Sequence, residues 1–269
     1  MSLYYVNFVI YKLFYYYIYK TLVFMLPYLD VILKYEVIIM LKNTKGVIFD
    51  MDGTLVDSMW LWESIDRKIL NKRNIPMPEN LKQDIQTMTF YEVAKYFKNR
   101  FNLPESIEEI QNECYDTCVY EYSTNIPLKH GAREFLLLLK QKGIKIGLAT
   151  SNSRELTEIS LKKNKVYDLF DAITTVSEVK RGKSFPDIFL LTAKKLNLSP
   201  KDCIVFEDIL PAVKGAKAAG MSVVGVYDFY SDYQWDDVIK HADMYIFKYK
   251  DLTEGSVKFS SLSELLNIM

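Results

Sequence analysis

The sequence predicts an α/β protein: a doubly wound parallel sheet with a smaller all-α domain inserted into it. Two observations predict the sheet. Short apolar runs rich in β-branched residues recur after residue 40, and helical patterns alternate with these runs. A third predicts the insertion. Val47 and Ile144 are 97 positions apart, and the interval holds helical patterns but no convincing strand.

The composition is that of an ordinary folded protein. The chain has 269 residues, which at about 150 residues per domain allow one large or two modest domains. Hydrophobic residues make up 49% and charged residues 25%, a balance that argues against a disordered, collagen-like or disulfide-stapled chain. Lysine and arginine number 34, as do aspartate and glutamate, so no positive field points to nucleic acid as a partner.

The first 40 residues form an atypical extension. Nine of the 20 tyrosines lie there, and the segment has neither glycine nor alanine. Five charges and Pro27 interrupt its apolar runs, so it reads poorly as a membrane-spanning helix, and it lacks the basic start of a signal peptide. We favour translation from Met40, which removes the segment and any membrane partner. A membrane anchor and an unusual packing arm are the alternatives.

Six short apolar runs are expected to form buried parallel strands. Each is bounded by polar residues or glycine. In chain order they are residues 45–50, 144–149, 172–176, 203–206, 222–226 and, as the weakest, 243–247. Helical patterns lie between them at residues 132–141, 153–164, 187–196 and 212–219. This alternation predicts βαβ units and a Rossmann-like core.

A helical insertion is expected after the first strand. Residues 60–73, 90–101 and 106–123 show amphipathic helical patterns. We assign residues 58–126 to this cap domain and residues 41–57 and 127–269 to the α/β core. Ligands of such sheets bind at the carboxyl ends of the strands, so the cap is expected to lie over that edge as a lid.

The three cysteines favour a reducing, cytoplasmic location. Cys114, Cys118 and Cys203 are odd in number and lack the spacing of zinc ligands. Cys114 and Cys118 lie one turn apart on a predicted helix. A shared core face explains that spacing more simply than a metal or redox pair, because no further ligands accompany them.

Two carboxylates follow the first expected strand. Asp50 and Asp52 are two positions apart, and at a partly desolvated strand end they would repel one another. A divalent cation removes that repulsion, and Mg²⁺ prefers hard oxygen ligands together with a substrate phosphate. Gly53 allows the chain to turn sharply and to approach a ligand closely. A solvated acidic turn that caps a helix is the alternative interpretation.

Phosphate-binding groups are expected after the later strands. Thr150, Ser151 and Asn152 lead into a helix, whose free N–H groups and positive dipole end suit phosphate. Asn152 with Glu155 three positions later reads as a capping signature. Lys183 precedes another predicted helix and would neutralise both a phosphate and an aspartate. Taken singly, the first signal is weak against an ordinary helix cap, and a surface lysine is the better interpretation of the second.

The fourth expected strand also ends in two carboxylates. Glu207 and Asp208 follow it directly. Parallel strands bring their carboxyl ends to one edge of the sheet, so these residues are expected to join Asp50 and Asp52. Two acidic pairs with Lys183 between them in the chain form a constellation far more specific than any of its parts.

Together these motifs resemble those of the haloacid dehalogenase-like hydrolases, in the branch of phosphatases and β-phosphoglucomutase-like proteins with a helical cap after the first strand. The four motifs are Asp-Met-Asp-Gly-Thr-Leu-Val-Asp-Ser at 50–58, Thr-Ser-Asn at 150–152, Lys183 with Pro-Asp-Ile-Phe at 186–189, and Phe-Glu-Asp at 206–208 with Gly-Ala-Lys-Ala-Ala-Gly-Met at 215–221. Two positions depart from the family pattern. Ser184 stands where proline usually follows the lysine, and Ile209 stands where serine usually follows Glu-Asp.

The resemblance implies a role for each motif residue. Asp50 would be the nucleophile that attacks phosphorus and forms an aspartyl-phosphate. Asp52 would be the general acid for the leaving oxygen and then the base for water. The phosphoryl group would be bound by Gly53, Thr150, Ser151, Asn152 and Lys183. Mg²⁺ would be held by Asp50, Glu207, Asp208 and the backbone carbonyl of Asp52.

Within the family, the residues favour hydrolysis of a small phosphorylated metabolite. Asp52 argues against the dehalogenase and phosphonatase branches, which lack a second aspartate. Residues 86–90 have no arginine, whereas mutases carry a Gly-x-x-Arg element there that grips a second phosphate. A sugar-phosphate mutase is therefore the runner-up, and a non-enzymatic or membrane-tethered family member comes third.

Substrate selectivity is expected from the first cap helix. Trp60, Trp62, Asp66 and Arg67 are the candidates, since an indole ring would stack on a sugar or a base. Residues two apart do not share a helix face. At least one of the two tryptophans is therefore expected to pack inside the cap instead.

Overall fold

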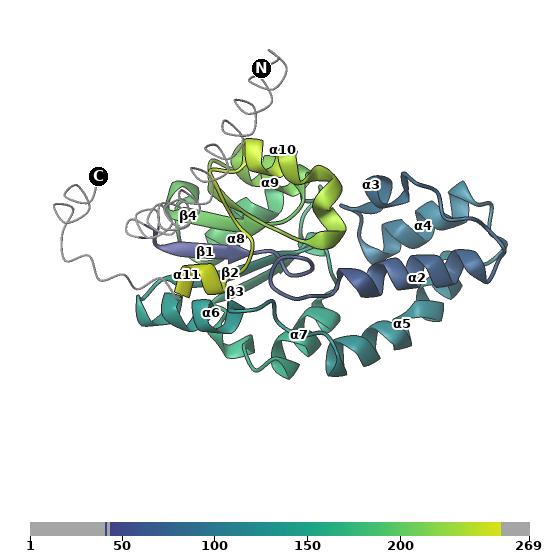
Figure 1. The fold of residues 1–269 in the computed structure, drawn as a ribbon, viewed down its shortest axis with the longest axis horizontal. Helices are drawn as coiled ribbons and strands as arrows, with labels where there is room; N and C mark the ends of the chain where they lie inside the picture. Colours follow the sequence, from purple (N-terminus) through teal and green to yellow (C-terminus); the bar gives the residue numbers. More distant parts are fainter. Residues whose placement is uncertain (1–40, 42–43, 254–269) are drawn as a thin grey trace, which may run out of the picture. The chain divides into compact units, whose positions relative to one another are not determined.

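The computed structural model describes residue 41 and residues 44–253. In that part of the chain six strands form one parallel sheet in the order β3-β2-β1-β4-β5-β6 (Figure 1). They are β1 (Gly46–Phe49), β2 (Lys145–Thr150), β3 (Ala172–Thr175), β4 (Cys203–Glu207), β5 (Ser222–Val226) and β6 (Met244–Ile246). All six expected strands are present, and the predicted α/β class is confirmed.

The strand order reverses at β1: β2 and β3 lie on one side of it, and β4, β5 and β6 lie on the other. Phe49 of β1 pairs with Leu148 of β2 on one side and with Phe206 of β4 on the other. One residue further along, the N–H of Asp50 donates to the carbonyl of Phe206 at 3.0 Å. This register places Asp50 beside Glu207 at the carboxyl edge of the sheet.

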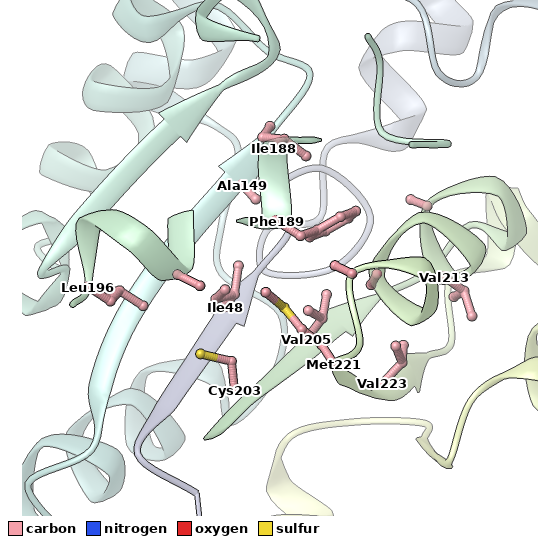
Figure 2. Packing of buried hydrophobic residues seen from close by; sticks show 14 of the residues in the cluster. Ile48, Ala149, Ile188, Phe189, Leu196, Cys203, Val205, Val213, Met221 and Val223 are labelled. Carbon is pink, nitrogen blue, oxygen red and sulfur yellow. The ribbon is translucent and has the colours of Figure 1, made fainter. Parts of the chain in front are cut away.

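One face of the sheet packs against α8 (Asp187–Lys195) and α9 (Leu210–Ala218). Ile48, Val205 and Val223, from three neighbouring strands, are fully buried there (Figure 2). The residues that precede and follow each of them in the strand point to the opposite face of the sheet, because successive side chains of a strand alternate between its two faces.

The opposite face carries an aromatic cluster. Phe49 and Phe206 stack with ring centroids 5.0 Å apart, and Phe135 of α6 (Ala132–Gln141) lies 5.4 Å from Phe206. The short α11 (Lys250–Thr253) packs against α6. Both faces of the sheet are thus covered, as an all-parallel sheet requires.

A group of helices lies between β1 and α6, to one side of the sheet (Figure 1). They are α2 (Met59–Asn71), α3 (Leu81–Ile85), α4 (Phe90–Arg100) and α5 (Ile107–Thr124). Capping boxes begin two of them, Thr89 with Glu92 at α4 and Ser106 with Glu109 at α5. The helical insertion is confirmed, and α5 also packs along α7 (Arg154–Lys163) of the core. The domain limits at 58 and 126 stay a prediction.

Shorter elements complete the core. They are α10 (Trp235–His241) and the 3₁₀ segments η1 (Tyr167–Leu169), η2 (Val176–Glu178), η3 (Pro200–Asp202) and η4 (Phe229–Gln234). None of the helices within the described ranges has the length and apolarity to cross a bilayer. The predicted start at Met40 and the alternatives for residues 1–40 lie outside the described residues.

The cysteines behave as core residues. Cys114 and Cys118 are buried on α5, and Cys203 is buried in β4; all three are free thiols. Burial raises the pKa of Cys114 to about 11 and that of Cys118 to about 12, so both thiols stay protonated. The predicted shared core face is confirmed.

Candidate active site

Three buried carboxylates meet where the strand order reverses. Asp50, Glu207 and Asp208 each place an oxygen within 4.8 Å of the other two. Burial raises the pKa of each carboxyl group. Repulsion from Asp52 adds to the effect at Asp50, and repulsion from Asp50 adds to it at Glu207 and Asp208; the pKa of Asp208 rises to about 7. Sequence reasoning expected these groups to meet at the carboxyl edge, and the fold brings them there.

Lys183 lies between two of these carboxylates. Its Nζ is 2.6 Å from Asp50 Oδ1 and 2.5 Å from Glu207 Oε2, and only 2% of the residue is exposed. Burial opposes the charge of the ammonium, but the two carboxylates outweigh it and raise the pKa of Lys183. The lysine is therefore charged and offsets one of the three negative charges.

The remaining charge fits a divalent cation. Three ionised carboxylates and one ammonium leave two negative charges in a buried cluster, which is costly without a compensating ion. The donor set consists of hard carboxylate oxygens, the ligands that Mg²⁺ prefers. Asp50, Glu207 and Asp208 therefore suit Mg²⁺ in both charge and chemistry.

Neighbouring residues hold Asp208 in place. Its Oδ1 accepts a hydrogen bond from Thr54 Oγ1 and its Oδ2 one from Ser231 Oγ, both at 2.8 Å. Gly53 has a left-handed φ of 81°, and a Cβ on it would lie 2.6 Å from Asp208 Oδ2. Gly53 is thus needed for the turn and for the close approach of the Asp208 carboxylate. The sequence analysis expected this glycine to approach a ligand, whereas the group that it approaches here is the Asp208 side chain.

Asp52 lies outside the acidic trio and accepts hydrogen bonds on both oxygens. Oδ1 accepts from Ser58 Oγ at 2.6 Å and from the hydroxyl of Tyr122. Oδ2 accepts from Asn152 Nδ2 at 2.9 Å. Ser58 and Tyr122 belong to the predicted cap and Asn152 to the core, so both parts orient this carboxylate. The predicted metal contact through the Asp52 carbonyl stays a prediction.

Tyr122 is a site residue that sequence reasoning missed. It is fully buried near the end of α5, and its hydroxyl accepts from Trp62 Nε1 at 3.1 Å and from Asn152 Nδ2 at 2.9 Å. With two donors directed at it, the hydroxyl gives its own proton to Asp52. Burial raises the pKa of Tyr122 well above 10, so it remains a neutral donor. One tyrosine on an amphipathic helix carries no sequence signal for this role.

The end of β2 differs from the prediction in one respect. Ser153, and not Asn152, caps α7, because Ser153 Oγ accepts from the N–H of Leu156 at 3.2 Å. The predicted capping signature at Asn152 is therefore wrong, and its amide is directed at Asp52 instead. Thr150 is buried, and its Oγ1 accepts from the N–H of Asn152 at 3.0 Å.

A cavity extends from the acidic cluster into the cap. Ser151 and Lys183 line its base, and Trp62 and Asp66 line it from α2. Two predicted selectivity residues lie outside it. Trp60 Nε1 donates to the carbonyl of Asp57 at 3.0 Å. Arg67 is exposed and pairs with Glu63 at 2.8 Å. The helical twist of α2 turns both residues away, so the structure removes them from the candidate site.

Comparisons with known proteins agree with this geometry. The family model described as haloacid dehalogenase-like hydrolase matches residues 47–226. A phosphorylated carbohydrates phosphatase of Thermotoga maritima is 30% identical over 70% of this chain and 88% of its own length. The β-phosphoglucomutase of Bacillus subtilis is 32% identical over 68% of this chain and 83% of its own. A crystal structure of a hydrolase from Pseudomonas syringae, 26% identical, covers 78% of this chain and 96% of its own with a TM-score of 0.64. The chain therefore belongs to the haloacid dehalogenase-like hydrolase family, in its branch of phosphatases and β-phosphoglucomutase-like proteins.

Proposed function

We propose that this protein is a Mg²⁺-dependent phosphatase that hydrolyses a small-molecule phosphate monoester through an aspartyl-phosphate on Asp50. The observation that carries the proposal is the position of Asp50, held by Lys183 at 2.6 Å within the buried carboxylate trio at the base of the cavity. Membership of the family and the relative that is named a phosphatase support phosphoric monoester hydrolysis.

Asp50 and Asp52 divide the chemistry between them. An oxygen of Asp50 attacks phosphorus, and the bond from phosphorus to the leaving oxygen breaks while Asp52 gives that oxygen a proton. Water then attacks the aspartyl-phosphate, Asp52 accepts the proton of this water, and the bond between phosphorus and Asp50 breaks. Inorganic phosphate and the alcohol are the products.

Charged and polar groups around Asp50 stabilise the transferring phosphoryl group. Mg²⁺ held by the carboxylate trio would supply positive charge that offsets the repulsion between Asp50 and a phosphate dianion. Lys183 adds a second positive charge. Thr150 Oγ1 accepts a hydrogen bond from the backbone, so its own proton is available for a phosphoryl oxygen. We assign Asn152 to orienting Asp52, because its amide already donates there.

A sugar-phosphate mutase is less well supported, although one relative carries a mutase name. A bisphosphate intermediate requires a second anion site inside the cap. Two lysines line the cavity in the described part of the chain. Lys183 belongs to the acidic cluster, and Lys82 Nζ is 2.6 Å from Glu63 Oε2. Among the described residues that line the cavity, no cation is therefore left without a carboxylate partner for a second phosphate.

Phosphate release tests the proposal directly. The wild-type protein is incubated with a panel of sugar, nucleotide and aryl phosphates, with Mg²⁺ and with a chelator. We expect release only with Mg²⁺, and none from an Asp50→Asn variant, which lacks the nucleophilic carboxylate. Asp57→Asn makes the same chemical change on an exposed side chain seven positions away and serves as the matched control. Full turnover by Asp50→Asn would contradict the mechanism.

A further inference from the structure

The cap side of the cavity is an apolar chamber. Trp62, Ile65 and Ile69 line it from α2, and Phe90, Val93 and Phe97 line it from α4. Both sets follow helical spacing, so each helix turns one continuous face inward. Sugar hydroxyls would leave hydrogen bonds unmade against such walls, whereas a flat ring system would bury its surface favourably.

Most polar side chains of the cap that line this chamber are already committed to protein partners. Lys82 pairs with Glu63 at 2.6 Å. Gln86 Oε1 accepts from Gln234 Nε2 at 3.0 Å, a hydrogen bond that joins the cap to the core. Trp62 Nε1 donates to the Tyr122 hydroxyl at 3.1 Å.

Asp66 is the exception. It lines the chamber with only 7% of the residue exposed, and no hydrogen bond or ion pair engages its carboxyl group among residues 44–253. Burial raises its pKa to about 7; the nearby Glu63 adds to this effect and Lys82 opposes it. A carboxyl group this buried is costly when ionised unless water or a ligand in the chamber supplies a donor.

The helix α2 sets the distance from Asp66 to the reaction centre. Ser58 precedes α2, and its Oγ is 2.6 Å from Asp52 Oδ1. Asp66 lies eight residues further along, which at 1.5 Å per residue is roughly 12 Å along the helix axis. That separation leaves room for one or two rings between the leaving oxygen and a group that contacts Asp66.

We propose that this chamber binds the leaving group of the substrate, and that this group is a flat ring system bearing an N–H donor that pairs with Asp66. The inference rests on the phosphatase function proposed above and deepens it. It assigns the substrate to phosphate monoesters of N–H-bearing heterocycles, or of flat rings that carry an amino group on a side chain, rather than to simple sugar phosphates.

Two pairs of compounds test this assignment on the wild-type protein. Uridine 5′-phosphate carries a ring N–H that 3-methyluridine 5′-phosphate lacks, and pyridoxamine 5′-phosphate carries an amine where pyridoxine 5′-phosphate has a hydroxyl. We expect kcat/KM to be roughly 10-fold higher or more for the N–H member of at least one pair, the size of a hydrogen bond to a charged group. The pair that responds distinguishes a ring N–H from an ammonium group.

An Asp66→Asn variant tests the residue. The amide removes the negative charge, so the preference within the responding pair is expected to fall below about 3-fold. Asp116→Asn makes the same change on an exposed position of α5 and is expected to keep the wild-type preference. Because a preference in the wild type is itself required, the inference stays testable even if Asp66→Asn folds poorly.

Failure of this inference differs from failure of the proposed function. A wild-type protein that releases phosphate from p-nitrophenyl phosphate but treats both members of each pair alike would overturn the role of Asp66 alone. An unchanged preference in a folded Asp66→Asn variant would do the same. If no ester is cleaved, the phosphatase function is wrong. Calorimetric titration of both pairs into the Asp50→Asn variant then decides whether the chamber prefers the N–H compound.

Discussion

Asp66 makes the stability of the folded chain depend on pH. Its pKa is about 7 in the fold against an ordinary 3.8, so between these values the folded state binds a proton that the unfolded chain has released. Below about pH 4 Asp66 is protonated in both states and costs no stability. As the pH rises from about 4 through 7, the free energy of unfolding falls, because the unfolded chain releases the proton more easily than the folded chain does. The difference between the two pKa values corresponds to at most roughly 4 kcal/mol.

We accordingly expect Asp66→Asn to raise the free energy of unfolding at pH 8 and to change it little at pH 4. The neutral amide avoids the cost of a buried ionised carboxylate, so the gain at pH 8 approaches but does not exceed the limit of about 4 kcal/mol. Urea unfolding at both pH values measures it. Asp116→Asn, on the exposed surface, should show no such pH dependence. An equal effect of Asp66→Asn at the two pH values would refute this prediction.

Tyr122 is expected to act by positioning Asp52 and not by contacting phosphorus. Tyr122→Phe removes the hydroxyl that donates to Asp52 Oδ1 and leaves the ring that packs beside Trp62. A misplaced Asp52 protonates the leaving oxygen less well, which matters most for poor leaving groups. We expect kcat to fall roughly 10-fold or more for an alkyl phosphate and much less for p-nitrophenyl phosphate. A purely structural role would lower both rates equally.

At the scale of single elements, patterns within the sequence anticipated most of the fold. The strands were predictable because buried parallel strands are short, uniformly apolar runs, and 203–206 differs from β4 by one residue. The helix α3 (Leu81–Ile85) was missed, because five residues are too few to show a period of 3.6. At α7 the sequence analysis assigned the cap to Asn152, whereas the adjacent Ser153 is the residue that caps the helix. The local pattern could not show this, because the side chain of Asn152 is engaged by a distant residue, Asp52.

The close contact between α9 and the loop that carries Lys183 is expected to be needed for activity. Gly215 lies within α9, and a Cβ on it would be 2.0 Å from the carbonyl oxygen of Lys183. Gly215→Ala must therefore displace the helix or the loop, although alanine favours helices. We expect kcat for phosphate release to fall at least 10-fold and stability to fall by about 1–3 kcal/mol.

Gly182→Ala is the matched control for that substitution. It adds the same methyl group next to Lys183, where the nearest atom would be the carbonyl oxygen of Thr87 at an ordinary 3.4 Å. Steady-state kinetics and thermal melts of both variants are expected to show a loss in Gly215→Ala alone. Wild-type kcat in a folded Gly215→Ala would mean that the placement of Lys183 does not depend on α9.

At the scale of the whole molecule, the site depends on contacts that no local pattern encodes. The motif carboxylates were predictable because parallel strands share one carboxyl edge. The hydrogen bond from Tyr122 to Asp52 depends instead on how α5 docks against α7, and the partnerless state of Asp66 depends on how α2 and α4 enclose the chamber. Such properties arise from packing between elements far apart in the chain. The motif carboxylates of the site could therefore be predicted from the sequence, whereas the hydrogen bond of Tyr122 and the environment of Asp66 could not.

The unbalanced charge of the acidic trio predicts that Mg²⁺ stabilises the whole molecule. When all three carboxylates are ionised, the trio has two uncompensated negative charges and favours an ion that binds the folded chain and not the unfolded one, so saturation at about 100 times Kd adds about 2.7 kcal/mol. For a chain of this size that corresponds to a rise in Tm of roughly 5–10 °C. Melting curves with Mg²⁺, with a chelator, and with NaCl at equal ionic strength measure the effect. In Asp208→Asn, which removes a ligand and one of the charges, the shift should shrink or vanish. An equal shift in that variant would place the ion elsewhere. An equal shift with NaCl alone would mean that ionic strength, and not Mg²⁺ bound at the trio, causes the effect.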